Sequence, residues 1–476
     1  MIRIVCLLFI YLGLGNENGL KAAYAPGDTS VARPNIIIIY TDDLGYGDLS
    51  CQGGDIPTPH IDRIGAAGIR FTDFYVAAPA CTPSRYGLLT GAFPQRSHHG
   101  LERVIYAGHD GHLDSTEVIL PQFLKQRGYA TALMGKWHLG GHPLDHGFDQ
   151  FVGLTQGCVD YFTHVAEFPF SKFPTEPDWF INREKRKETG YVTDLITQHT
   201  LQYLDQQTAA GQPFFLFLSY NAPHYGKSEG ATAPPQLTVS LEEKAPSPHT
   251  FGPVFKSLQA PEAYLNRFRH IANIHRRYYA AMVANLDDNV GRVLTHLQQR
   301  GLYRNTIIWF ISDNGGYART LFGHASNGPL RGQKTELYEG GIRVPGLLCW
   351  PAHVRAGQVI RQPVINLDVL PTLATLTGFQ ADLTDRPLDG IDLSQLLTEG
   401  KAPQRTLFWK YNNNQKALRQ GDWKWINDQL YRLSDDIGEK HNKAAEFPQQ
   451  AQAMKQTWQQ IDQSLSPYRR HSLKKP

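Results

Sequence analysis

Cysteine is scarce in this chain, which has five in 476 residues. Cys6 lies in the apolar N-terminal stretch, and the other four are scattered as Cys51, Cys81, Cys158 and Cys349. Small secreted domains that depend on disulfides carry many closely spaced cysteines, so this chain is not of that class. The spacing predicts no particular disulfide pair.

Other features are missing as well. The chain has no Walker motif and no H-E-x-x-H sequence, which argues against P-loop nucleotide hydrolases and zincin-type proteases. The formal net charge is only +3, and the sequence as a whole is not rich in clusters of basic residues. Because a nucleic-acid-binding surface needs such clusters, we expect no nucleic-acid partner.

Residues 1–25 have the pattern of a secretory signal peptide. Arg3 provides the positive start, residues 4–14 form a short apolar run, and Ala23-Tyr24-Ala25 is a small-x-small cleavage site. The run is too short to cross a bilayer and no later stretch is long enough, so the sequence predicts no membrane span. We therefore expect an exported protein, either periplasmic or secreted.

Alternating strands and helices predict an α/β fold. Residues 35–40 are a continuous, mostly β-branched run, typical of a strand buried on both faces of a parallel sheet. Further strands are expected at 69–76, 129–134, 213–220 and 305–312, and helices at 120–127, 192–207 and 267–300. This alternation gives a mixed, mostly parallel sheet sandwiched by helices.

The pattern changes at about residue 396. Short, turn-separated strands are expected at 406–411, 415–419, 423–426 and 429–433, and a last helix at 446–464. They predict a small antiparallel sheet plus a helix. We therefore divide the chain into a signal peptide (1–25), a large α/β domain (26–395) and a small C-terminal α+β subdomain (396–476).

Polar side chains follow four of the predicted strands. In chain order they are Asp42 and Asp43, Lys136 and His138, His224, and Asp313 and Asn314. Each alone has an ordinary explanation as a turn, a helix cap or a solvated side chain. The carboxyl ends of parallel strands meet at one edge of a sheet, where open α/β sheets bind ligands, so we expect these side chains to converge.

Four of these residues form an all-oxygen set of potential metal ligands: Asp42, Asp43, Asp313 and the amide oxygen of Asn314. Hard oxygen ligands suit Ca²⁺ or Mg²⁺, whereas Zn²⁺ prefers thiolate and imidazole clusters, and none completes this set. The sequence therefore predicts a site for a divalent cation at the sheet edge.

Cys81 begins a predicted helix. Pro83 suits a first helical turn, where its missing N–H costs nothing, and Gly91 can end the segment. A thiol at the positive end of a helix, beside Arg85, is placed where a thiolate or a developing anion is stabilised. The alternative is a buried structural cysteine near a helix start.

The stretch Cys81-Thr82-Pro83-Ser84-Arg85, closed by Leu89-Thr90-Gly91, resembles the sulfatase signature C-x-P-x-R. Other stretches resemble further segments of that family in the family's own order: 34–47 and 313–314 for the metal, 135–139 for a Lys-x-His, 328–334 for a second lysine, 339–345 for the stretch that follows, and 418–424 and 430–433 for the small C-terminal domain. Over most of its length the chain is similar to formylglycine-dependent type I sulfatases of the arylsulfatase A and B kind.

This resemblance implies an alkaline-phosphatase-like fold and the hydrolysis of sulfate esters. In the family, a formylglycine-generating enzyme oxidises the cysteine, here Cys81, to formylglycine, an aldehyde whose hydrate attacks sulfur and leaves a covalent sulfate that is then eliminated. The resemblance also implies Ca²⁺, with Mg²⁺ as an alternative, at Asp42, Asp43, Asp313, Asn314 and residue 81.

The resemblance assigns roles to five more side chains. Lys136 and Lys334 would hold sulfate oxygens, and Arg85 would orient the nucleophile and stabilise its anionic form. His138 would transfer protons at the nucleophile. His224 would protonate the leaving oxygen or donate a hydrogen bond to it.

The sequence indicates less about the substrate than about the reaction. Residues 157–164 look like a segment of arylsulfatase-B-like members that act on sulfated sugars, which makes Asp160, Tyr161 and His164 candidate sugar contacts, although they could equally form a packed turn. A Pro-rich insertion between Gly226 and Leu258 is expected to shape the pocket.

We expect a sulfated polysaccharide or oligosaccharide as substrate. The alternatives are a phosphomonoester or phosphonate hydrolase of the same fold and an inactive protein that binds sulfated glycans.

Overall fold

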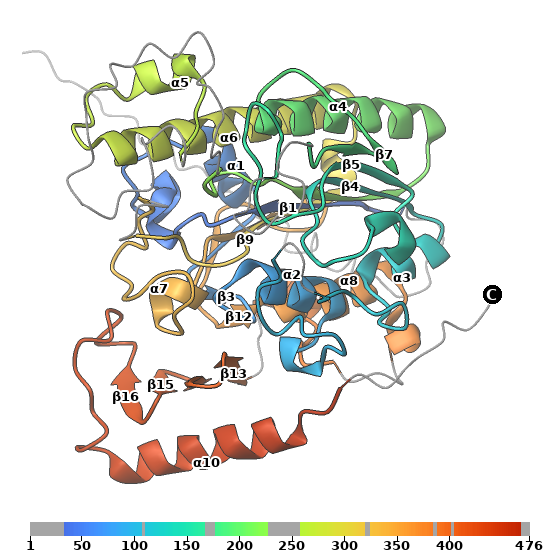
Figure 1. Ribbon diagram of the computed structural model, residues 1–476. Coiled ribbons are helices and arrows are strands. Elements are labelled where there is room, and N and C mark those ends of the chain that lie inside the picture. Colours follow the sequence, from blue (N-terminus) through green and yellow to red (C-terminus); the bar gives the residue numbers. More distant parts are fainter. Residues whose placement is uncertain are drawn as a thin grey trace, which may run out of the picture. The chain divides into compact units, whose positions relative to one another are not determined.

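Strand β1 (Asn35–Thr41) lies at the middle of a large mixed sheet in the computed structural model (Figure 1). It pairs in parallel with β8 on one side and β9 on the other, and β4 continues the parallel part beside β8. The full strand order is β11 (Gln358–Ile360), β2 (Ile69–Phe71), β10 (Gly346–Cys349), β9 (Thr306–Ser312), β1, β8 (Phe214–Ser219), β4 (Ala130–Lys136), β5 (Gln150–Leu154), β6 (Phe180–Ile181) and β7 (Glu184–Lys185). The predicted fold class is confirmed.

The structure describes residues 33–106, 110–166, 177–226, 258–318, 324–383, 388–400 and 404–467. The predicted signal peptide and most of the Pro-rich insertion lie outside these residues. No helix among the described residues is long and apolar enough to cross a membrane. Within these described residues, the cysteines at 51, 81, 158 and 349 form no disulfide.

Helices cover both faces of the sheet (Figure 1). Side chains of β1 alternate between two hydrophobic cores, with Ile36 and Ile38 in one and Ile37 and Ile39 in the other, as the two-residue period of a strand requires. The first core is closed by α2 (Cys81–Thr90), α3 (Leu120–Gln126), α8 (Val369–Thr377) and α9 (Ser394–Glu399). The second is closed by α1 (Pro59–Ala66), α4 (Val192–Ala210), α5 (Glu262–Arg267) and α6 (Ile274–Gln299).

Two predicted elements have different bounds in the structure. The strand expected at 69–76 is two short strands, β2 and β3 (Phe74–Tyr75), and β3 pairs with β12 (Val364–Ile365) rather than with the large sheet. The helix expected at 267–300 begins later, as α6, and α5 ends at Arg267, where that helix was expected to begin. The side chain of Asn273 accepts a hydrogen bond from the backbone N–H of Arg276, so Asn273 is the N-cap of α6.

A second, four-stranded sheet lies near the C-terminus: β13 (Thr406–Tyr411), β14 (Gln415–Gln420), β15 (Trp423–Ile426) and β16 (Gln429–Arg432). Its strands are antiparallel, as predicted. One face packs on α10 (Pro448–Ser464) through Trp425 and Trp458. The other face packs on the larger part of the chain, where Trp409 meets Tyr75 at a ring distance of 5.3 Å. The boundary at residue 396 stays a prediction.

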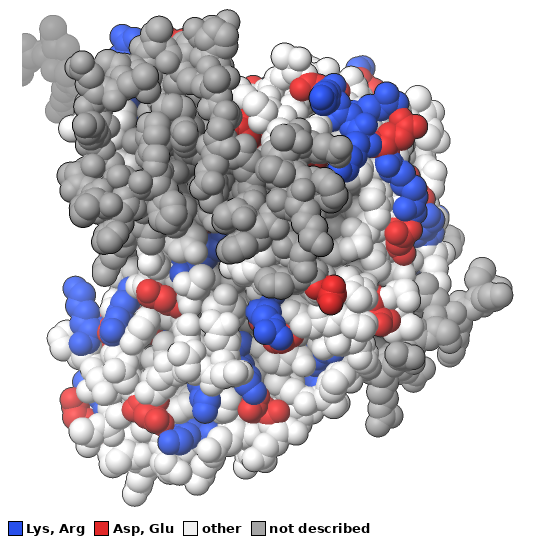
Figure 2. Space-filling view, viewed as in Figure 1, with Lys and Arg blue, Asp and Glu red and all other residues white. Residues whose placement is uncertain are grey.

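Charges of both signs are mixed on the face shown in Figure 2, and much of that face is uncharged. The basic side chains at its upper right lie where Figure 1 places β7, and residues 183–187 are exposed there. Arg183 pairs with Asp145 at 2.5 Å, and Arg186 pairs with Glu184. Two of the basic side chains of this region are therefore paired with carboxylates, which reduces its positive charge.

Candidate active site

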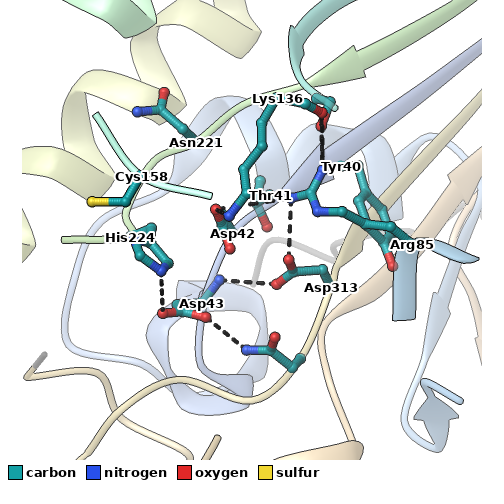
Figure 3. A network of polar contacts seen from close by, with 12 residues as sticks. Tyr40, Thr41, Asp42, Asp43, Arg85, Lys136, Cys158, Asn221, His224 and Asp313 are labelled. Carbon is teal, nitrogen blue, oxygen red and sulfur yellow. Dashed lines mark hydrogen bonds and ion pairs between the residues drawn. The ribbon is translucent and has the colours of Figure 1, made fainter. Parts of the chain in front are cut away.

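The polar residues expected at the sheet edge meet there. Asp42 and Asp43 follow β1, Asp313 and Asn314 follow β9, and Lys136 is the last residue of β4. Because β4, β8, β1 and β9 are neighbours and parallel, their carboxyl ends lie side by side. Figure 3 shows Asp42, Asp43 and Asp313 within one network, with His224 reaching it from the loop after β8.

Each carboxylate of this network has a basic partner. Lys136 donates a hydrogen bond to Asp42, the ammonium of Lys334 lies 2.6 Å from Oδ1 of Asp43, and the Arg85 guanidinium lies 3.1 Å from Oδ2 of Asp313. All of these side chains are buried. The formal charges of three carboxylates and three basic groups cancel, so the network is neutral as it stands.

Cys81 is the first residue of α2 and is 2% exposed. One turn further along α2, Arg85 donates hydrogen bonds to the Ser219 hydroxyl at 2.6 Å and to the backbone carbonyl of Lys136 at 3.1 Å. Burial alone would lower the pKa of Arg85, but nearby charges raise it, first those of Asp313 and Asp42 and more weakly that of Cys81. The charge of Cys81 acts on both Arg85 and Asp313, so Cys81 lies close to the acidic network.

Two oxygen atoms of the network lack a donor. Oδ1 of Asp42 and Oδ1 of Asn314 have no hydrogen-bond partner, although both residues are 0% exposed. A buried acceptor without a donor is costly, and such atoms usually mark an ion or a ligand. Burial, followed by the charge of Asp42, also raises the pKa of Asp313. A divalent cation would use the unpartnered oxygens and relieve the repulsion, so the residues present fit one.

Two positions in the site have a left-handed backbone, namely Asp43 (φ 65°) and His138 (φ 57°). Residues other than glycine adopt this conformation rarely, and it persists where the surroundings fix it. The backbone N–H of Asp43 donates to Oδ1 of Asp313 at 3.1 Å. Such strain collects at functional sites, which is a reason to assign function to this edge of the sheet.

The two histidines are oriented by their hydrogen bonds. Nε2 of His138 lies 2.9 Å from the backbone oxygen of Ile105 and donates to it, which leaves the buried Nδ1 as a free acceptor. Burial, followed by the charge of Lys136, holds the pKa of His138 well below its usual value. His138 is therefore a neutral imidazole with an open basic nitrogen.

His224 donates from Nδ1 to the backbone oxygen of Tyr225 at 2.7 Å and stacks on the Tyr225 ring. Its Nε2 lies 3.6 Å from Oδ2 of Asp43. Burial lowers its pKa from 6.5 to about 4, against the opposing charges of Asp42 and Asp43. Ligand atoms of Asp42, Asp43 and His224 all lie within 4.8 Å of one another, so His224 faces the cation site more directly than its sequence position indicates.

The three candidate sugar contacts are buried and satisfied within the protein. Asp160 accepts hydrogen bonds from the backbone N–H groups of Phe162 and Thr163, and His164 lies 3.0 Å from the backbone oxygen of Gly190. The Tyr161 hydroxyl donates to the backbone oxygen of His224 at 2.7 Å. These bonds favour the packed-turn alternative, in which the segment supports the His224 loop.

Three tyrosines near Cys81 are not indicated by the sequence: Tyr106, Tyr317 and Tyr411. The ammonium of Lys334 lies 5.3 Å from the centre of the Tyr317 ring. Burial, followed by the charge of Cys81, raises the pKa of both Tyr106 and Tyr411. They come from a loop, the end of the Asp313 segment and the C-terminal sheet, so no local pattern in the sequence connects them.

A cavity of about 620 Å³ opens beside His138. Its lining includes Tyr106, His112, Thr155 and Gln156, which offer an aromatic ring and hydrogen-bonding groups. No lysine or arginine lines it within the described residues. The cavity therefore suits a neutral, hydroxyl-bearing group better than a second anion.

The ring of His146 lies 5.8 Å from that of Trp137, so His146 packs against the segment that carries His138. It also makes the stability of the protein sensitive to acid. Burial lowers its pKa from 6.5 to about 4, while Asp145 and Asp114 raise it and His112 and His142 lower it. Between pH 6.5 and pH 4 this histidine is therefore protonated more in the unfolded chain than in the folded one. The free energy of unfolding falls as the pH falls through this range.

Replacing His146 by phenylalanine should remove this loss and keep an aromatic ring beside Trp137. Between pH 7 and pH 5 the wild-type protein should lose about 2 kcal/mol more free energy of unfolding than His146→Phe. Urea unfolding at the two pH values measures the difference. An equal loss in both proteins would show that His146 is not responsible.

The fold and the site together define a hydrolase of the alkaline-phosphatase-like class. The family model described as "Sulfatase" matches residues 34–379. The chain belongs to the sulfatase family, whose members are sulfuric ester hydrolases.

A named relative agrees with this assignment, and two solved structures share the fold. The chain is 32% identical to the N-acetylgalactosamine-6-sulfatase of Mus musculus over 434 residues, covering 86% of this chain and 75% of that protein. The crystal structure of Ps i-CgsB in complex with k-i-k-neocarrahexaose is 30% identical with a TM-score of 0.77, covering 91% of this chain and 94% of that one. The phosphonate monoester hydrolase of Agrobacterium radiobacter shares the fold, at 20% identity and a TM-score of 0.59, covering 90% and 96%.

Proposed function

We propose that this protein is an exported sulfatase that removes sulfate from a sulfated polysaccharide or oligosaccharide. The observation that carries the proposal is the position of Cys81, at the start of α2 within electrostatic reach of Arg85, Lys334 and an acidic network that holds two unpartnered oxygens. Conversion of Cys81 to formylglycine, by a formylglycine-generating enzyme before or during export, would supply the nucleophilic hydroxyl.

Asp42, Asp43, Asp313 and Asn314 would hold the cation, with residue 81 beside them. Their hard oxygens favour Ca²⁺, and Mg²⁺ is the alternative. When bound, such a cation polarises a sulfate oxygen and lowers the pKa of a nearby hydroxyl. His224 lies beside this set, with Nε2 at 3.6 Å from Oδ2 of Asp43.

The basic side chains would bind the sulfate group. Lys136 and Lys334 present buried ammonium groups, each of which uses one acidic partner and retains further N–H donors for an oxyanion. Arg85 is fixed by Ser219, the carbonyl of Lys136 and Asp313, so it would orient residue 81 rather than follow the substrate. Preorganised donors of this kind are effective because they are buried and need no rearrangement.

The histidines would move protons. His138 has an open, neutral Nδ1 and can accept a proton at residue 81. His224 can protonate the leaving oxygen, or hydrogen-bond to it, only from Nε2, because Nδ1 is used by Tyr225. An incoming sulfate beside His224 would favour the protonated ring, as a nearby negative charge does.

The sugar ring would extend into the cavity beside His138. Its lining of Tyr106, His112 and Gln156 suits a hydroxyl-bearing ring, and no lysine or arginine lines it among the described residues. The sulfate would instead bind at Lys136 and Lys334. The similarity to Ps i-CgsB, solved with k-i-k-neocarrahexaose, supports a carbohydrate substrate.

A substrate panel tests this proposal. The protein is made in a host that contains the formylglycine-generating enzyme and assayed with aryl sulfates, sulfated mono- and oligosaccharides, and a phosphate monoester. We expect sulfate release, fastest from a sulfated carbohydrate. Release of phosphate with no release of sulfate from any ester would favour the phosphomonoester or phosphonate hydrolase alternative.

Gly157 leaves room for the His138 ring, and its substitution tests the proposed role of His138. A Cβ atom at position 157 would lie 2.6 Å from both Cε1 and Nε2 of the His138 ring, so Gly157→Ala must displace that ring. We expect kcat to fall about tenfold, because a displaced base transfers protons poorly. Gly65→Ala is the control, since its Cβ would come closest to a flexible Leu347 methyl group, at 3.1 Å, and would otherwise make ordinary van der Waals contacts. Unchanged kcat in Gly157→Ala would remove His138 from the mechanism.

A further inference from the structure

The segment that carries Lys334 has a strained backbone. Lys334 lies outside the helices and strands, in a turn, and the next residue, Thr335, has φ 73°. A β-branched residue with a positive φ is an outlier, and such a conformation persists only where the surroundings fix it. Some contact must therefore hold the backbone that aims Lys334 at Asp43.

Two hydrogen bonds hold Thr335 from opposite sides. Its N–H donates to the backbone oxygen of Pro79 at 2.7 Å, two residues before Cys81. Its carbonyl accepts a hydrogen bond from Nε2 of Gln415 at 2.8 Å, and Oε1 of Gln415 accepts one from the N–H of Leu337 at 3.1 Å. One amide side chain thus clamps residues 335–337.

Gln415 belongs to the C-terminal sheet rather than to the sheet that carries the site. It is the first residue of β14 and pairs across the β13–β14 hairpin with Tyr411. Burial, followed by the charge of Cys81, raises the pKa of the Tyr411 phenol, and the charge of Lys334 lowers it, so this end of the hairpin lies near both groups. The small sheet therefore meets the active site at its β13–β14 turn.

We propose that Gln415 is a positioning residue that fixes Lys334 for binding the substrate's sulfate group, so that the C-terminal sheet completes the active site. This inference rests on the proposed function of Lys334. A lysine side chain is long and flexible, and its direction depends on the backbone that carries it. Without the clamp, Thr335 can relax from its left-handed conformation and turn the neighbouring Lys334 away from Asp43.

The test compares Gln415→Leu with Gln429→Leu. Leucine has a similar size to glutamine but neither donates nor accepts. Gln429 is the matched control, because it lies in β16 of the same sheet and accepts a hydrogen bond from the Tyr338 hydroxyl at 3.1 Å, beyond the clamped residues. We expect Gln415→Leu to weaken the binding of inorganic sulfate, measured by calorimetry, and to raise KM, each about tenfold. Gln429→Leu should change both by less than about twofold.

A double-mutant cycle separates positioning from general stability. If Gln415 acts through Lys334, Gln415→Leu should have no further effect on sulfate binding in a Lys334→Ala background. An equal loss in both backgrounds, or a loss shared by Gln429→Leu, would overturn the proposal. Thermal unfolding of each variant checks that it is folded. Failure of the wild-type protein to release sulfate from any ester would instead overturn the proposed function, while calorimetry would still test the clamp.

Discussion

Replacing Cys81 by alanine is expected to lower sulfate-ester turnover by a factor on the order of a million, the scale seen when an enzyme loses its nucleophile. Cys81 is buried at the start of α2 beside an acidic network, and no other cysteine of the described residues occupies such a position. Turnover is followed as sulfate release from an ester that the wild-type protein cleaves.

Cys349→Ala is the control for this substitution. Cys349 is a buried thiol at the end of β10, with a pKa raised to about 12 by burial, and we give it no part in the reaction. Its loss should leave turnover within about threefold. If Cys81→Ala kept a substantial part of the wild-type activity, the nucleophile would have to be another group.

Sulfate and Ca²⁺ are expected to raise one another's affinity about 100-fold. Three carboxylates and three basic side chains cancel formally in the buried network, so a lone cation or a lone anion adds uncompensated charge where it is costly. Bound together, they leave the network nearly balanced. The coupling should therefore exceed what two separate surface sites would give.

Calorimetry on the Cys81→Ala protein measures this coupling without turnover. Ca²⁺ is titrated in sodium sulfate and in sodium chloride of equal ionic strength, which controls for screening. By reciprocity, the affinity for sulfate must rise by the same factor when Ca²⁺ is present. Equal Ca²⁺ affinities in the two salts would contradict a shared site, and Mg²⁺ in the same titration compares the two cations.

The edge of the sheet could be predicted because it follows from local patterns. The apolar run before Asp42 and the strand before Asp313 are recognisable in the sequence, and parallel strands bring their carboxyl ends together. Lys136 fits the same logic as the last residue of β4. Lys334 does not, since it lies in a turn, and only the resemblance to sulfatases points to it.

The surroundings of the site depend on contacts that no local pattern records. Tyr411 and Gln415 come from the C-terminal sheet, and their distance from Cys81 along the chain hides their proximity in space. Tyr161 resembled a sugar contact in sequence, but its hydroxyl supports the His224 loop. Polar residue types alone do not tell whether a side chain faces a substrate or the protein interior.

The most direct test of the central claim is the mass of one tryptic peptide. Cleavage after Arg70 and Arg85 releases residues 71–85, with Cys81 inside. From a host that contains the formylglycine-generating enzyme, we predict a peptide in which Cys81 has lost its sulfur and two hydrogens and gained an oxygen, or the hydrate of that aldehyde. An unmodified thiol in that host would contradict the formylglycine mechanism.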